Sequence, residues 1–152
     1  EDFTRLEGCS QLRSINLPSS LRYIGGYAFS GCSSLQSVSF PKYLSEIGGN
    51  AFEGCSSLTF GSLPPLLTEI RAYCFSGCSS ISKVVVPDGV SRIGASAFRG
   101  CSSLSELVLP ESLQEIGSSA FRNCGSLDQE LVLPQGCNVS ERAFKDSPTV
   151  LK

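Results

Sequence analysis

Apolar and polar positions follow a 23-residue repeat along this chain. The unit that begins at Leu35 has the sequence Leu-x-x-Val-x-Phe-Pro-x-x-Leu-x-x-Ile-Gly-x-x-Ala-Phe-x-Gly-Cys-Ser-Ser. Its first part alternates between apolar and polar residues, and this period of two predicts a short β-strand. The proline ends the strand, because it has no N–H group to donate to a neighbouring strand.

The second part of each unit predicts a different local structure. The Leu-x-x-Ile pair predicts another short extended piece, and the glycine that follows it permits a tight turn. The Ala-Phe-x-Gly-Cys stretch predicts one helical or 3₁₀ turn that returns the chain to the next strand. We therefore expect a protein made mostly of strands and turns, with short helical turns.

The same residue types keep this spacing through about six units. The recurring cysteines are Cys9, Cys32, Cys55, Cys78, Cys101 and Cys124. The recurring phenylalanines are Phe29, Phe52, Phe75, Phe98, Phe121 and Phe144. One unit cannot bury its own apolar face, so the units must stack, and we expect a repeat solenoid.

We expect one solenoid domain over residues 1–152, with atypical units at both ends. Residues 1–9 form a partial repeat, and an uncapped edge there predicts a contact with a neighbour. The unit over residues 128–152 is degenerate. Pro134 follows Pro110 one position later than the repeat requires, and Ser147 stands in the cysteine position. An irregular last unit is typical of a capping repeat.

The segment from Leu44 to Leu58, Leu-x-x-Ile-Gly-x-x-Ala-Phe-x-Gly-Cys-x-x-Leu, resembles the BspA-like, or treponemal-type, leucine-rich repeats. The segment from Leu113 to Leu127 has the same pattern, with Asn123 in place of the glycine. The resemblance implies a leucine-rich-repeat-like right-handed coil with a parallel β-sheet on its concave face. It also implies a role in adhesion or protein recognition, since many members are surface proteins of bacteria and parasitic protists.

Composition narrows the classes of function. Twelve Lys and Arg against fourteen Asp and Glu give a net charge of −2, too weak a field to attract nucleic acid or anionic lipid. No apolar run approaches the roughly 20 residues that span a bilayer, so we expect no membrane insertion. The chain has no histidine, the commonest general base, and we expect neither an enzyme nor a cofactor.

One column of charged residues leaves an enzymatic alternative open. Carboxylates in neighbouring units could lie near the separation of about 5–5.5 Å that retaining glycosidases use. The favoured interpretation is a solvated charge ladder, in which the arginine pairs with either neighbouring glutamate. The column contains Glu46, Glu69, Arg92 and Glu115.

The cysteine column has three interpretations: packed free thiols, disulfides or a metal site. Strands in a sheet lie about 4.8 Å apart, farther than the roughly 3.5–4.5 Å between Cβ atoms in a disulfide. Metal sites favour cysteine pairs at short spacing, and the nearest pair is Cys74-x-x-x-Cys78. We expect buried free thiols and no metal, with disulfides and metal as the alternatives.

A binding site is expected on the outward positions of the strands before each proline. With the alternate residues facing the core, these positions carry an apolar valine stripe flanked by charges. The alternative is that valine is simply a good strand residue on a tolerant surface. The candidate binding residues are Phe60, Lys83, Val85, Glu106, Val108, Glu130 and Val132. Asn138, in Asn138-Val139-Ser140, is a candidate glycosylation site.

These observations predict a non-catalytic binding module that recognises a protein, such as a host or matrix protein, or a glycan through its concave sheet. The alternative is an architectural spacer or assembly subunit that contacts partners through its ends and outer surface. The resemblance implies a cell-surface or secreted location. A cytoplasmic location is the alternative, because unpaired cysteines are stable in a reducing compartment.

Overall fold

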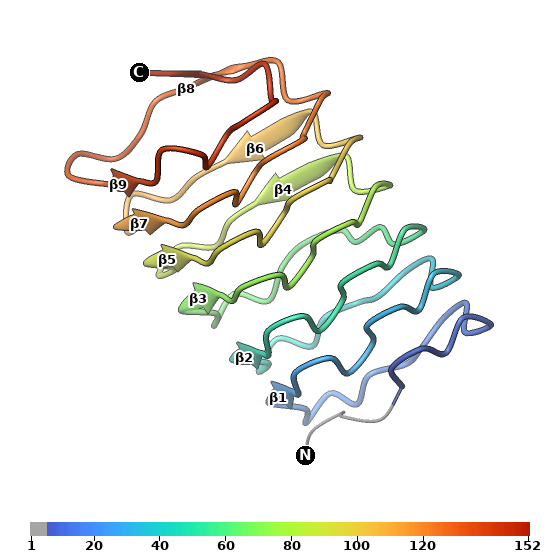
Figure 1. The fold of residues 1–152 in the computed structure, drawn as a ribbon. Coiled ribbons are helices and arrows are strands. Elements are labelled where there is room, and N and C mark those ends of the chain that lie inside the picture. The colour runs from blue at the N-terminus through green and yellow to red at the C-terminus, as the bar shows by residue number, and fades with distance from the viewer. Residues whose placement is uncertain (1–5) are drawn as a thin grey trace.

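The computed structural model describes residues 6–152, which form a parallel-strand β-solenoid (Figure 1). Each coil passes through two short extended segments, and these stack into two rows. The first row, after the prolines, contains β1 (Tyr23–Ile24), β2 (Glu46–Ile47), β3 (Glu69–Ile70), β5 (Arg92–Ile93), β7 (Glu115–Ile116) and β9 (Asn138–Val139). The second row contains β4 (Lys83–Val85), β6 (Glu106–Val108) and β8 (Glu130–Leu131), each before a proline, and β10 (Val150–Leu151) in the last coil. The prediction of a repeat solenoid is confirmed.

The two rows pair to different extents. In the first row β1 pairs with β2, and β3, β5, β7 and β9 form one four-stranded parallel sheet. The second row is divided into the pairs β4–β6 and β8–β10, preceded by isolated bridges from Ser14 to Ser37 and from Ser37 to Thr59. The longest sheet is thus built from the second extended piece of each unit. The alternation in the sequence had predicted the clearer strand in the first piece, before the proline.

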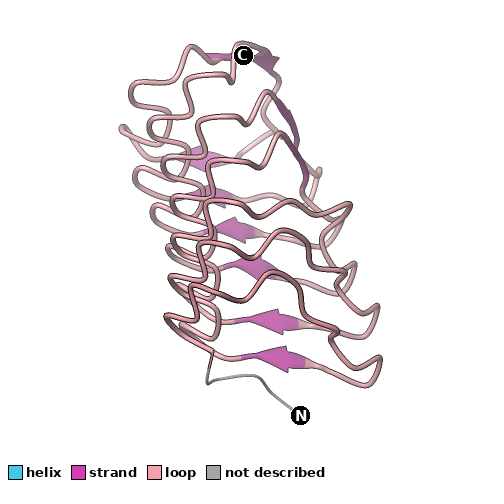
Figure 2. Cartoon of the chain, turned by 90° about the vertical axis from the view of Figure 1, so that its right-hand side faces the viewer, coloured by secondary structure: helices cyan, strands magenta, loops and turns pink. Residues whose placement is uncertain are grey.

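The expected helical turns do not form, and residues 6–152 contain no helix (Figure 2). In the Ala-Phe-x-Gly-Cys stretch the backbone N–H groups donate alternately to the next coil and to a turn within their own coil. Phe29 N donates to Ala51 O of the next coil, whereas Ser30 N closes a turn on Tyr27 O. Tyr27 and Gly31 have φ values of 62° and 77°. A helix needs uniform right-handed φ/ψ, so left-handed residues four apart make a series of turns instead.

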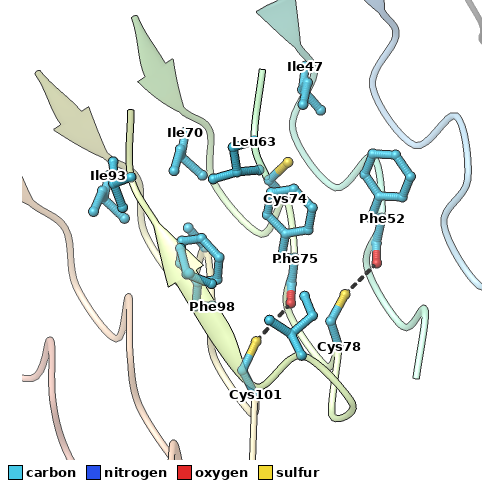
Figure 3. Close-up of a cluster of buried hydrophobic side chains, with 14 of the residues drawn as sticks. Ile47, Phe52, Leu63, Ile70, Cys74, Phe75, Cys78, Ile93, Phe98 and Cys101 are labelled. Carbon is cyan, nitrogen blue, oxygen red and sulfur yellow. Dashed lines mark hydrogen bonds between the residues drawn. The ribbon is translucent and has the colours of Figure 1, made fainter. Parts of the chain in front are cut away.

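The core is a column of stacked phenylalanine rings (Figure 3). Phe52, Phe75 and Phe98 are fully buried, with centroids 5.5 and 5.4 Å apart and rings nearly parallel. The column continues to Phe29 and Phe144 at its two ends. The predicted continuous buried stack is confirmed, and each of these three rings stacks on the rings of the coils before and after it.

The end units differ from the central ones. Leu6 and Cys9 of the predicted partial repeat are half-buried, and Leu6 N donates to Ala28 O. The part of that prediction that falls on residues 1–5 lies outside the described residues. In the last coil Ser147 replaces the cysteine: its Oγ donates to Phe121 O at 2.6 Å and accepts from Cys124 N at 2.9 Å. No helix among residues 6–152 is long and apolar enough to cross a bilayer.

Candidate binding surfaces

One predicted site residue, Phe60, faces the core instead of solvent. Ser37 pairs with Thr59, where the 23-residue repeat would place Phe60, so the strand is shifted by one residue. A shift of one residue turns every side chain of a strand to the opposite face. The Phe60 ring is half-buried and lies 5.4 Å from Phe75 and 5.7 Å from Phe40 between centroids. Its placement on the outward face was wrong.

The same shift explains the break in the second row. The 23-residue repeat places Gly61 in the inward position of Val38 and Val84, but Gly61 lies in an exposed bend. In the described part of the chain, no strand pairing joins this coil to β4. A hollow of about 320 Å³ lies at the break, lined by Ser62, Leu63, Pro65, Val85, Val86, Pro87 and Asp88. The break therefore places a shallow depression beside the valine stripe.

The valine stripe, defined as Val85, Val108 and Val132, is open to solvent. The three side chains are 46%, 45% and 76% exposed. Val85 and Val108 lie directly side by side, because β4 and β6 pair in register. Adjacent exposed apolar side chains such as Val85 and Val108 form the kind of patch that marks an interaction surface. Their role in binding stays a prediction.

Charges flank the valine stripe as the sequence indicated. Lys83 Nζ lies 3.6 Å from Glu106 Oε2, and both side chains are exposed. Glu130 Oε2 lies 3.3 Å from Lys152 Nζ, a partner that the repeat pattern does not indicate. Exposed ion pairs contribute only about 0–1 kcal/mol to stability. These charges are therefore more important for the character of the surface than for the fold.

Between β6 and β8 a side chain takes the place of strand pairing. Leu107 N donates to Gln129 Oε1 at 3.0 Å, and Gln129 Nε2 donates to Leu107 O at 3.1 Å. Glu130 follows Glu106 one position later than the repeat requires, so the unit has one extra residue at this point. The carboxamide has the same donor and acceptor as a peptide group, and it fills the gap in the ladder. Gln129 thus links β6 to the coil that carries Val132.

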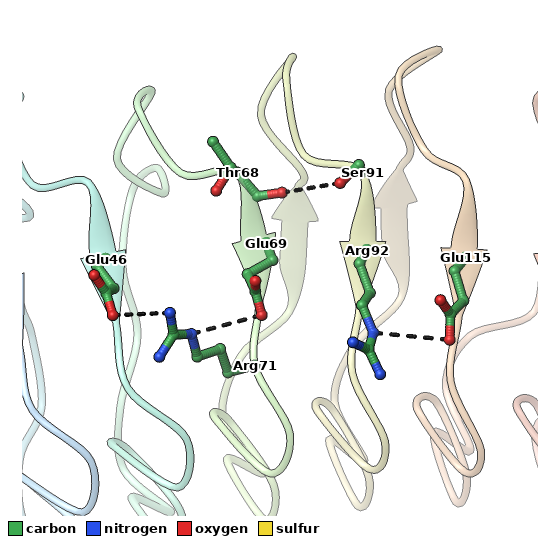
Figure 4. Close-up of polar contacts among 7 residues, drawn as sticks. All are labelled: Glu46, Thr68, Glu69, Arg71, Ser91, Arg92 and Glu115. Carbon is green, nitrogen blue, oxygen red and sulfur yellow. Dashed lines mark hydrogen bonds and ion pairs between the residues drawn. The ribbon is translucent and has the colours of Figure 1, made fainter.

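The charged column of the first row forms a ladder of ion pairs (Figure 4). Arg92 Nε lies 3.7 Å from Glu115 Oε2, which confirms one of its two expected pairings. The other glutamates pair instead with Arg71, whose Nη2 lies 2.8 Å from Glu46 Oε2 and whose Nε lies 3.5 Å from Glu69 Oε1. A glycosidase holds its substrate between two carboxylates, and here a guanidinium occupies that place.

Arg71 also marks where the first row is broken. Gly94 and Gly117 stand in the equivalent position of later coils, and an added Cβ would lie 2.7 Å from Ala72 N and 2.8 Å from Ala95 N, respectively. Real Cβ atoms do not approach backbone so closely, so a side chain requires a wider separation between coils. Within residues 6–152, β2 and β3 are not paired. Arg71 both prevents the close stacking and bridges the gap.

The ladder cysteines are free, and each thiol from Cys32 onward donates a hydrogen bond to the preceding coil. Cys78 Sγ, for example, donates to Phe52 O at 3.1 Å (Figure 3). Burial raises the pKa of the Cys55 thiol, and likewise that of Cys124, from 9.0 to about 12. The expected free, packed thiols are confirmed, although Cys9 is only half-buried. High pKa values keep the thiols protonated and unreactive.

The remaining candidate chemistry gives no further site among residues 6–152. No group of three cysteine or carboxylate side chains in this part of the chain is placed to hold a metal ion. Asn138 begins β9 and is exposed, and its N–H donates to Gln114 O. An exposed side chain on a paired strand is accessible from one face only. Glycosylation of Asn138 stays a prediction.

Known repeat proteins share both the sequence pattern and this architecture. Residues 4–127 match the BspA-type leucine-rich repeat region in six copies. The chain belongs to the BspA-type leucine-rich repeat family. This class of repeat is generally non-enzymatic, and it indicates a repeat module for protein interaction. A comparison with curated proteins gives no match.

Solved structures of other members of the class superimpose well on this BspA-type chain. The leucine-rich repeat protein of Treponema pallidum is 33% identical, with a TM-score of 0.73 over 91% of this chain and 73% of that one. A leucine-rich cell surface protein of Faecalibacterium prausnitzii is 30% identical, with a TM-score of 0.72 over 84% of this chain. The match spans about a third (31%) of that protein. The pneumococcal vaccine antigen PcpA, 22% identical with a TM-score of 0.51, shares the fold.

Sequence reasoning missed three residues that shape these surfaces: Arg71, Gln129 and Tyr43. The first two stand where the repeat is interrupted, by a non-glycine residue and by an insertion. Tyr43 is exposed in the loop after Pro41, and Arg22 and Lys42 lie within cation–π distance of its ring. When the repeat units are aligned, each of these residues stands out because it departs from the residue types at the same position in other units. That comparison could have identified all three.

Proposed function

We propose that this chain is a protein-binding module whose recognition surface is the valine stripe. The observation that carries the proposal is the side-by-side exposure of Val85 and Val108 on paired strands, at 46% and 45%. Apolar side chains at the centre of a contact, surrounded by charges, are the usual anatomy of a protein interface. Val132 extends the stripe, and the Lys83–Glu106 and Glu130–Lys152 pairs form its rim.

The shape of this surface supports a protein partner. The hollow of about 320 Å³ beside Val85 lies next to the stripe and can receive a side chain of the partner. Affinity in protein interfaces is concentrated in a few side chains that fill such depressions. The rim carries both positive and negative charges. It therefore helps to orient a partner with complementary charges and does not attract every protein of one charge sign.

We propose a location on the cell surface, where the partner is a host or matrix protein. The support is the naming of similar structures as a cell surface protein and a vaccine antigen. Six of the eight free cysteines are buried, which makes them compatible with an oxidising environment, while Cys9 and Cys137 are half-buried. Burial and raised pKa values protect the ladder thiols from Cys32 to Cys124 from oxidation, since the thiolate is the reactive species.

Binding to a panel of purified extracellular matrix proteins, measured by biolayer interferometry, tests this function. The double variant Val85→Lys/Val108→Lys places two charges in the centre of the surface. We expect wild-type binding to at least one panel protein and a loss of at least about tenfold in affinity in the variant, equivalent to about 1.4 kcal/mol.

A variant of the opposite row is the matched control. Glu46→Gln/Glu115→Gln also changes the net charge by two, at the half-buried Glu46 and the exposed Glu115, and its affinity should stay within about twofold of wild type. Absence of binding to every panel protein would contradict the partner class. Equal loss in both double variants would contradict the assignment of the surface, and it would favour an architectural segment that uses its outer face.

A further inference from the structure

A second concave site lies in the loops that follow the first two prolines, away from the valine stripe. It is a hollow of about 660 Å³ lined by Ser19, Ser20, Arg22, Pro41, Lys42 and Tyr43. Pockets for small molecules commonly enclose about 300–1,000 Å³. The volume therefore fits one or two sugar rings or a compound of similar size.

The chemistry of the hollow is cationic and aromatic. The Tyr43 ring is 48% exposed, with Arg22 Cζ at 5.8 Å and Lys42 Nζ at 5.2 Å from its centroid. These distances are in the range of cation–π interactions, which fix both cations beside the ring. No carboxylate lines the hollow, and neither cation forms an ion pair within the described residues. Two uncompensated positive charges thus meet in a chain of net charge −2.

The other coils show that the repeat does not require these residues. The position of Lys42 is occupied by Ser19, Pro65, Asp88 and Glu111 in other units. The position of Tyr43 is occupied by Ser20, Leu66, Gly89 and Ser112. In all five loops the residue after these positions donates its N–H to the carbonyl oxygen of the proline three residues earlier, although Gly89 differs from the others in having a positive φ, of 97°. Lys42 and Tyr43 are therefore specific to this coil, and the charge at the equivalent position is negative in later coils.

We propose that this hollow binds an acidic glycan, that is, a saccharide carrying carboxylate or sulfate groups. Arg22 and Lys42 supply charge-assisted hydrogen bonds to the anionic group. The exposed face of the Tyr43 ring packs against the apolar C–H face of a sugar, toward which the negative π-face is attractive. Serine hydroxyls in the lining match the hydroxyl groups of the saccharide.

An acidic peptide is the less favoured ligand for this hollow. Extended peptides are usually bound by adding a strand to a free sheet edge or by pockets for alternate side chains. Here β1 and β2 pair with each other, and the hollow is formed by the loops that precede them. The single aromatic ring with flanking cations is better matched to one sugar ring and its acidic substituent.

Isothermal titration calorimetry at about 0.15 M salt, where exposed charges are screened beyond about 8 Å, tests the proposal. The ligands are a sulfated, uronic-acid-containing tetrasaccharide, its desulfated and carboxyl-reduced form, tetraglutamate, and inorganic sulfate. We expect only the acidic tetrasaccharide to bind with substantial affinity. Equal affinity for the neutral saccharide, for tetraglutamate or for sulfate, or no binding at all, overturns the proposal.

Variants locate the site. Arg22→Gln/Lys42→Gln and Tyr43→Ala should each weaken binding at least about tenfold, whereas Tyr43→Phe should keep it. Arg142→Gln/Lys145→Gln removes the same charge from exposed positions in the last coil and should change affinity less than about twofold. An equal loss in this control would show attraction by overall charge and overturn the site. The Val85→Lys/Val108→Lys variant should bind the saccharide normally, so the two proposals fail independently.

Discussion

The side-chain amide of Gln129 acts as a peptide group for Leu107, accepting from its N–H and donating to its carbonyl oxygen. This contact lies where one extra residue interrupts the 23-residue repeat. Without it, the second row would have a gap between β6 and β8. The gap would fall inside the proposed recognition surface, between Val108 and Val132.

Replacement of Gln129 by leucine should therefore destabilise the solenoid. The change leaves the Leu107 N–H and carbonyl groups without a protein partner, and we expect a loss of about 1–3 kcal/mol in the free energy of unfolding. Urea unfolding measures the loss, and hydrogen exchange should show faster exchange of the Leu107 amide. Gln135→Leu, in an exposed loop, is the control and should change stability by less than about 0.5 kcal/mol. Equal stability of the two variants would show that the amide does not replace strand pairing.

The phenylalanine column predicts a larger effect in the core. Phe75 is fully buried and stacks on Phe52 and Phe98, so Phe75→Ala removes two stacking contacts and the contact with Phe60. We expect a loss of about 3–5 kcal/mol in urea unfolding. The exposed Val85→Ala is the control. Because each coil is covered only by its neighbours, a loss below about 1 kcal/mol would mean that the coils do not depend on the stack.

The buried thiols predict a decrease in stability at high pH. The pKa of Cys55 is raised from 9.0 to about 12 in the folded protein, so between these values the folded chain binds more protons than the unfolded chain. Stability is complete below pH 9 and falls toward pH 12, by up to about 1.4 kcal/mol per pH unit for each such thiol.

Chemical denaturation of wild type and Cys55→Ala between pH 8 and about 11 measures this effect. All other ionisable groups are the same in the two proteins, so the difference in slope isolates one thiol. The wild type should have the steeper slope. Parallel curves would indicate that Cys55 titrates normally in the folded state, and therefore that it is not protected.

The regular columns were predictable from the sequence because their residues face the same environment in every coil. Phe75 and Cys78 are buried as the spacing indicated. The prediction for Phe60 was wrong because the strand pairing there departs from the 23-residue spacing. A shift of one residue turns the Phe60 side chain toward the core. The expected helical turns failed because left-handed residues such as Tyr27 recur in each unit, and a tyrosine gives no sequence signal for positive φ.

The surface features were less predictable than the core. Exposure of Val85 follows from strand alternation, but the hollow beside it depends on the bend at Gly61. The pairing of Glu46 with Arg71 depends on the spacing between two coils, and the repeat pattern alone does not define that spacing. Both features arise where the 23-residue repeat is interrupted. The structure formed at such a point depends on how the neighbouring coils pack against it.

The central claim, that the valine stripe contacts a protein partner, is tested most directly by NMR with selectively ¹³C-methyl-labelled valines. The panel protein bound most tightly is titrated into the labelled chain. The account predicts that the methyl signals of Val85, Val108 and Val132 shift or broaden, while those of the buried Val38 and Val90 stay unchanged. Changes confined to Val139 and Val150, with the stripe unaffected, would contradict it.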